Sequence, residues 1–150
     1  MKRNIIYDYL DTESAVIRLL KDYRKYEHIL NTVNRELVEI DEKMCSVGAI
    51  RIDGMPRARN TGGREGYLIG LIAQKDMCIE KEERANEYMR MIKPALALLD
   101  DDEYEILNSL YIGEPVPVKN LAAGMGYSLS NLYLKRDEAI AALSLILYGR

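Results

Sequence analysis

The sequence predicts an all-α protein: a long antiparallel helical hairpin with coiled-coil-like spacing, followed by a small helix-turn-helix bundle. Three observations lead to this fold class. Apolar residues in the first part recur at alternating spacings of three and four, a stretch rich in glycine and arginine interrupts that pattern, and the C-terminal part contains short apolar helices around one glycine turn. We expect the hairpin arm to span residues 1–94, with a basic loop at 46–66, and the bundle to span residues 95–150.

The first predicted helix is defined by a long apolar repeat. The repeat comprises Val16, Leu19, Tyr23, Tyr26, Leu30, Val33, Leu37, Ile40, Met44 and Val47. A period near 3.5 residues, held over several heptads, is typical of a coiled-coil helix. Asp11 or Thr12 precedes the repeat and can cap its first turn.

The second helix of the hairpin is predicted to begin near Tyr67, after "SVGAIRIDGMPRARNTGGREG", whose glycines and proline disfavour helix and strand. The residues expected to face the first helix are Leu68, Leu71, Ile72, Cys78, Ile79, Ala85, Met89 and Ile92. Lys75 and Glu82 interrupt this seam. Two helices of similar length joined by one loop form an antiparallel pair most simply. That pairing separates Cys45 and Cys78 too widely for a disulfide.

A joint between arm and tail is expected after Pro94, because proline removes a helix hydrogen bond and clashes with the preceding turn. The acidic run at 100–103 is interpreted as a helix cap with acids at the positive end of the helix dipole, in preference to a metal-binding cluster. Ile106, Leu107, Leu110 and Tyr111 then mark a short amphipathic helix, which the turn from Gly113 to Pro117 ends.

The tail meets the steric constraints of a helix-turn-helix. A helix is predicted from Val118 to Met125, with the small Ala122 where two helices approach closely. Gly126 supplies the positive φ that the tight turn needs. Ser128 is placed to cap the third helix. Its expected apolar stripe comprises Leu129, Leu132, Ala139, Ile140, Leu143 and Leu147.

Composition excludes several classes of protein. Net charge is −3, and residues 101–150 hold Lys119, Lys135, Arg136 and Arg150 against seven acids, so no broad basic surface is expected. One histidine and two cysteines do not form a metal-ligand set, and no metal or cofactor is predicted. There is no apolar run of membrane-spanning length and no clear signal peptide, so a cytoplasmic protein without membrane contact is expected. With no identifiable nucleophile–base pair or phosphate-binding glycine loop, we do not expect an enzyme.

The segment "PVKNLAAGMGYSLSNLYLKRDEAIAAL" resembles the C-terminal promoter-binding domain of bacterial sigma factors. The chain from roughly Leu37 to Leu143 also resembles a family of small phage and prophage proteins related to the RinA and ArpU regulators of late genes. The motifs that carry this resemblance are "GMPR" in the loop and "AAGMGYSLSNLY" in the tail. The resemblance implies a DNA-binding transcription regulator. The chain departs from the pattern at Leu129, Ser130, Asn131 and Leu134, where relatives carry more polar base-contacting residues, and at Pro117 and Lys135.

The expected DNA-binding residues are Ser128, Ser130, Asn131, Tyr133, Lys135, Arg136 and Lys119. Ser130, Asn131 and Tyr133 are nearest the bases in this interpretation, whereas Lys119, Lys135 and Arg136 contact phosphates. The loop residues Arg51, Arg57, Arg59 and Arg64 form either a solvated connector or a basic arm that contacts phosphates or an acidic partner.

Double-stranded DNA is the expected partner, bound by a homo-oligomer (a dimer or higher), because one weakly basic tail provides little affinity. The alternative is a non-enzymatic interaction or assembly protein. It takes two forms: a factor that docks on RNA polymerase, or a DNA-packaging recognition subunit similar to a small terminase.

Overall fold

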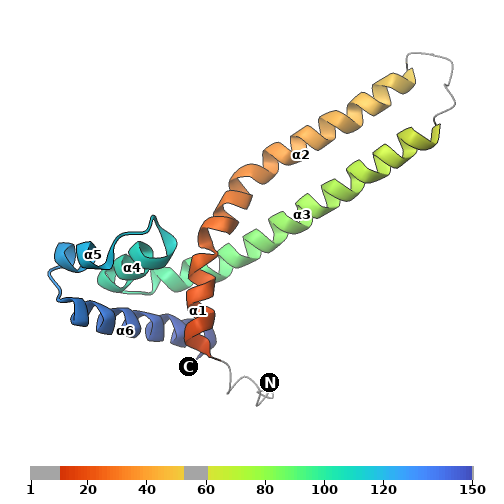
Figure 1. Cartoon of the computed structure of the whole chain (residues 1–150). Coiled ribbons are helices and arrows are strands. Elements are labelled where there is room, and N and C mark those ends of the chain that lie inside the picture. The colour runs from red at the N-terminus through yellow and green to blue at the C-terminus, as the bar shows by residue number, and fades with distance from the viewer. Residues whose placement is uncertain (1–10, 53–60, 150) are drawn as a thin grey trace. The chain divides into compact units, whose positions relative to one another are not determined.

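The computed structural model describes residues 11–52 and 61–149, and within these ranges the chain forms helices and no strand (Figure 1). The predicted all-α class is therefore confirmed. The helices are α1 (Thr12–Lys21), α2 (Tyr23–Ile52), α3 (Thr61–Ala97), α4 (Asp101–Leu107), the π-helix η2 (Asn108–Ile112), α5 (Val118–Met125) and α6 (Leu129–Tyr148). The described residues divide into two compact units: 26–52 with 61–88, and 11–25 with 89–149.

The first of these units is an antiparallel pair formed by α2 and α3 (Figure 1). Two ion pairs link the helices: Lys81 Nζ lies 2.7 Å from Glu36 Oε2, and Lys75 Nζ lies 2.8 Å from Asp41 Oδ1. Residue numbers rise along α2 as they fall along α3, which confirms the predicted antiparallel hairpin. Because these four side chains are partly exposed, solvent screens both ion pairs, and the pairs chiefly specify the register of the two helices.

The apolar seam of α2 follows the predicted repeat. Val33 and Ile40 are buried, and the remaining seam positions from Tyr26 to Val47 are half-buried. The rings of Tyr26 and Tyr88 stack with centroids 4.3 Å apart. This heptad pattern was sufficient to locate the buried face of α2, because only one face of a helix can meet a single partner helix.

The seam of α3 corrects part of the prediction. Leu71 and Ala85 are buried, but Ile72 and Ile79 are 44% and 38% exposed and do not face α2 as expected. Leu71 and Ala85 are separated by whole heptads, so the inward face passes through half-buried Lys75. Lys75 is accommodated there because its ammonium group reaches a carboxylate on α2, and the isoleucines are left on the outer surface.

The predicted basic loop at 46–66 is too long. Helix α2 continues to Ile52 and α3 begins at Thr61, so the glycines at 62, 63 and 66 lie in a helix. A glycine in a helix costs about 1 kcal/mol relative to alanine but keeps its backbone hydrogen bond, and adding a residue to an existing helix is far easier than nucleating one. The helical pattern therefore extends past residues that on composition alone indicate a break.

The first predicted helix is divided at Asp22, and the coiled-coil repeat does not run continuously from Val16. Helix α1 begins with Asp11 as its cap, whose Oδ1 accepts a hydrogen bond from the Ser14 N–H at 3.2 Å. Val16 and Leu20 are fully buried, and α1 packs against α6 and η2. Residues 11–25 thus join the C-terminal unit, a division that differs from the predicted one at 94/95.

The segment after Pro94 starts the C-terminal bundle. Helix α3 continues through Pro94 for one short turn and ends at Ala97. Asp100 then caps α4, and its backbone N–H donates a hydrogen bond to Glu103 Oε2 at 3.1 Å. The interpretation of this acidic run as a helix cap agrees with the structure, since these carboxylates lie at the positive end of the α4 dipole.

Among the described residues, no helix combines the length and apolar character that crossing a bilayer requires.

Candidate nucleic-acid interface

The helix-turn-helix core is formed by α4, α5 and α6 within the C-terminal unit. Ile106, Leu121, Ala122 and Leu132 make up one buried cluster. The partly buried residues packed on it are Leu110, Val118, Met125 and Tyr127. Ala122 is 4% exposed, so a larger side chain at this position has no solvent-filled space to enter. The small residue that the sequence places at the helix crossing therefore lies where the two helices need it.

The turn between α5 and α6 has the predicted geometry. Gly126 has φ 75° and ψ 22°, the left-handed conformation that side-chain-bearing residues adopt only at a cost. The Tyr127 N–H donates to the Ala122 carbonyl oxygen at 2.9 Å, which ends α5 in a capped turn. Ser128 Oγ accepts a hydrogen bond from the Asn131 N–H at 3.2 Å, so Ser128 caps α6. This oxygen therefore has a structural role, as the cap of α6, that does not depend on nucleic acid.

The exposed end of α6 carries mostly uncharged side chains. Ser130 is exposed and Asn131 is half-buried. Tyr133 is 40% exposed and Leu134 is 57% exposed. Leu129 was expected in the inward stripe but is 40% exposed, because the helix begins at this residue and its side chain precedes the first turn that packs on α5. The structure thus gathers Ser130, Tyr133 and Leu134 on the outward side of α6.

Arg136 is half-buried, and its guanidinium group has partners within its own chain. Its Nη2 and Nε atoms donate to Asp137 Oδ1 at 2.8 and 3.1 Å, and its guanidinium lies 5.1 Å from the centroid of the Tyr133 ring. The hydrogen bonds that Arg136 donates to the Asp137 carboxylate raise the pKa of Arg136, and Tyr111 and Glu13 also lie close enough to act on it. This half-buried arginine therefore interacts electrostatically with Tyr111 of η2 and Glu13 of α1.

Lys135 faces an acidic pocket. Its Nζ lies 3.4 Å from Glu138 Oε2. The pocket, about 550 Å³, is lined by Asp100, Asp101, Asp102, Glu103, Ile106, Tyr127, Lys135 and Glu138. The Tyr127 hydroxyl donates to Asp102 Oδ2 at 3.2 Å, and that hydrogen bond raises the pKa of Tyr127. Lys135 therefore lies among carboxylates of its own chain, which lower the positive potential around its ammonium group.

Lys119 is the predicted phosphate contact whose charge is least compensated. It lies in the first turn of α5, is exposed, and makes no ion pair with the described residues. The positive end of the α5 dipole adds to its field. A phosphate that approaches the start of α5 meets this ammonium group and the helix dipole together.

Of the four arginines in the predicted basic loop, the structure describes the side chain of Arg64 alone. Arg64 is exposed in the first turns of α3. Arg51 belongs to α2, but its side chain lies outside the described set, and Arg57 and Arg59 lie outside the described residues. The alternatives of solvated connector and contact arm both stay open as predictions.

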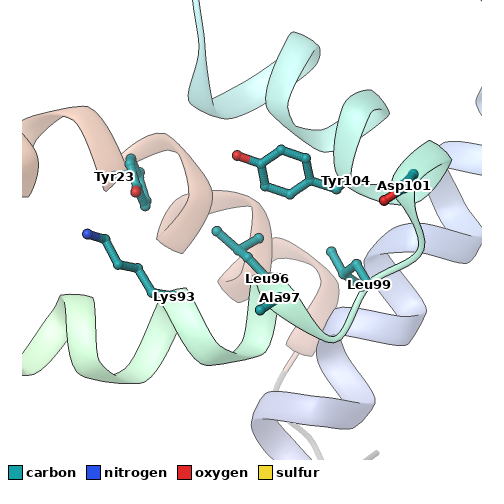
Figure 2. Close-up of a pocket in the computed structure, with 7 residues that line it drawn as sticks. All are labelled: Tyr23, Lys93, Leu96, Ala97, Leu99, Asp101 and Tyr104. Carbon is teal, nitrogen blue, oxygen red and sulfur yellow. The ribbon is translucent and has the colours of Figure 1, made fainter.

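A second pocket, about 350 Å³, lies beside the start of α2 and the end of α3 (Figure 2). Its lining comprises Tyr23, Lys93, Leu96, Ala97, Leu99, Asp101 and Tyr104. Figure 2 shows the Tyr104 ring directed across the pocket toward Tyr23, with Lys93 at one end and Asp101 at the other. One cation and one carboxylate on opposite sides do not provide the concentrated positive charge that a phosphate site needs. Neither pocket holds a described cluster of His, Cys, Asp and Glu able to bind a metal.

Sequence reasoning missed the acidic pocket. The signals were present in the aspartate run at 100–102 and in Glu138, but η2, α5 and two turns separate these residues in the sequence. Only the packing of α4 on α6 brings them to the same surface. The comparisons with known protein families, curated proteins and solved structures gave no match to this chain.

Proposed function

We propose that this protein is a DNA-binding transcription regulator of phage or prophage origin that controls late genes and acts as an oligomer in the cytoplasm. The observation that carries the proposal is the turn between α5 and α6: Gly126 at φ 75° follows a buried Ala122 and precedes a Ser128-capped helix. This arrangement leaves the first turns of α6 exposed, which is the part of a recognition helix that enters the major groove.

The charge distribution supports an oligomeric form of this proposal. With Lys135 and Arg136 engaged by acids of their own helix, Lys119 is the cation best placed to contact phosphate. A single tail with so few contacts binds duplex DNA weakly, since phosphate neutralisation supplies most non-specific affinity. Two tails held in one oligomer gain affinity from effective concentration without any new contact.

A binding titration tests the proposal. Fluorescence anisotropy of a labelled random-sequence duplex is measured at increasing salt, and sedimentation of the same protein reports its oligomeric state. We expect binding at low salt that weakens as salt rises, and Lys119→Glu to reduce the slope of log affinity against log salt by about 1 per tail. No detectable binding at low salt by a folded protein would refute the proposal.

Lys21→Glu is the matched control for that titration. Lys21 is exposed at the end of α1, and its substitution changes net charge by the same amount as Lys119→Glu. An equal loss of binding in both variants would show that only overall charge matters and that the start of α5 has no special role. Circular dichroism of each variant establishes that the helices are retained.

A second candidate function is favoured by one specific observation. Leu129, Tyr133 and Leu134 expose apolar surface on α6, and exposed apolar patches also mark protein interfaces. In that form the protein docks on RNA polymerase, or serves as a DNA-packaging recognition subunit, without enzymatic activity. Binding to purified RNA polymerase that Leu134→Ala removes, together with absence of DNA binding, is the result that distinguishes the polymerase-docking form from the proposed regulator and excludes the packaging subunit, which binds DNA.

A further inference from the structure

The outward surface of α6 is defined by the position of buried Leu132. Successive helix residues are rotated by about 100°, so Leu134 and Ser130 each lie about 200° from Leu132, on the opposite side of the helix. Leu132 is 0% exposed and Leu134 is 57% exposed, in agreement with this rotation. Tyr133 borders the same surface at 40% exposure. In the first two turns of α6 the side chains on this surface are therefore a serine, a tyrosine and a leucine, and the exposed carboxylate of Asp137 follows on the same side.

This surface has no cation directed outward at the start of α6. Arg136 donates both of its described hydrogen bonds to Asp137, and Lys135 is paired with Glu138. The most common specific contact in the major groove, an arginine to the O6 and N7 atoms of guanine, therefore has no donor here. Specificity must come from the hydroxyl groups, the Asn131 amide and the apolar side chain of Leu134.

Apolar side chains have one complementary group in the major groove. Every base edge there presents hydrogen-bond donors or acceptors, and only thymine also presents an apolar group, its C5-methyl. A leucine pressed against the polar edge of guanine, adenine or cytosine removes water from groups that it cannot satisfy, which costs affinity. Against a thymine methyl group the same leucine buries apolar surface on both sides.

We propose that α6 recognises thymine methyl groups, with Leu134 as the specificity-determining residue. This inference rests on the proposed DNA-binding function and adds the chemical class of its target, a thymine-containing half-site. Ser130 and Tyr133 contribute hydrogen bonds that tolerate several bases. Lys119 sets the position of the helix through a phosphate.

The experiment replaces thymidine with deoxyuridine, which removes the methyl group and leaves every hydrogen-bonding atom in place. Duplexes bound by the full-length protein are first enriched from a randomised pool. The enriched duplex is then synthesised with thymidine and with deoxyuridine, and the affinity of each is measured. We expect the affinity of the native protein to fall about fourfold for each methyl group contacted. We expect Leu134→Ala to bind the two duplexes with nearly equal affinity.

Leu145→Ala is the matched control. Leu145 is 61% exposed on the same helix but lies near its C-terminal end, so its truncation should leave the thymidine preference unchanged. Equal affinity of the native protein for the two duplexes overturns the inference while leaving the proposed function in place. A preference that Leu134→Ala retains also overturns the assignment. Absence of binding to every duplex at low salt refutes both the inference and the proposed function.

Discussion

Truncation of Leu132 is the sharpest test of the helix-turn-helix core. Leu132 is 0% exposed and belongs to the cluster with Ile106, Leu121 and Ala122. Leu→Ala removes about three methylene equivalents at about 0.8 kcal/mol each, and the remaining cavity adds further cost. We expect Leu132→Ala to lower the free energy of unfolding by roughly 2–5 kcal/mol.

Leu134→Ala provides a control with the same chemical change two residues away. Because Leu134 is 57% exposed, its truncation should lower the free energy of unfolding by less than about 1 kcal/mol, with part of that loss offset by the higher helix propensity of alanine. The two variants differ mainly in the burial of one side chain, so their difference isolates the packing contribution.

The assay combines thermal unfolding followed by circular dichroism with hydrogen exchange measured on peptides. Exchange is needed because the hairpin contributes much of the helical signal and the two units need not unfold together. For a domain of about 60–100 residues, each kcal/mol lowers the melting temperature by about 4–8 °C, so Leu132→Ala should lower it by about 10 °C or more. Peptides from α5 and α6 should lose protection. Equal behaviour of the Leu132 and Leu134 variants would refute the proposed packing.

Two further predictions concern the turn and the cysteines. Gly126→Ala should lower the free energy of unfolding by about 1–2 kcal/mol through backbone strain alone, since a Cβ at this position meets no atom within 4 Å. Gly124→Ala, within α5, should instead raise the free energy of unfolding by up to about 1 kcal/mol, because alanine has the higher helix propensity. Thermal unfolding in which both variants are less stable than the native protein would contradict this prediction. Cys78 should react with iodoacetamide more slowly than exposed Cys45 at pH 8, because burial and the nearby Glu36 carboxylate raise the pKa of the Cys78 thiol and reduce its thiolate fraction. Mass spectrometry of the two peptides measures the rates, and faster labelling of Cys78 is the opposing outcome.

Much of the local structure could be predicted because it depends on neighbours in the sequence. The Asp11, Asp100 and Ser128 caps, the left-handed Gly126 and the buried face of α2 all follow from residues within one or two helical turns. Backbone sterics and capping hydrogen bonds act over this range, and they do not depend on the partner of the helix.

Other features needed the packed structure. Periodicity alone placed the apolar Ile72 and Ile79, and not Lys75, on the inward face of α3. The structure places Lys75 there because its ammonium group forms an ion pair with Asp41 on the other helix, which periodicity cannot show. Periodicity also failed to predict the end of α1 at Asp22, because the apolar positions of α1 fall in the same heptad pattern as those of α2.

The candidate DNA surface shows the same division. The sequence by itself determined that a serine-capped helix follows a glycine turn, because those constraints are steric and local. Only the tertiary structure decided which of its cations face outward. Arg136 is drawn to Asp137 beside η2, and Lys135 to Glu138 beside the acidic start of α4. Both of these pairs are local to α6, because their partners are one and three residues apart. Packing decides the surroundings: α4 lies against α6, so Lys135 also shares a pocket with the carboxylates at the start of α4, which the linear sequence does not place beside it.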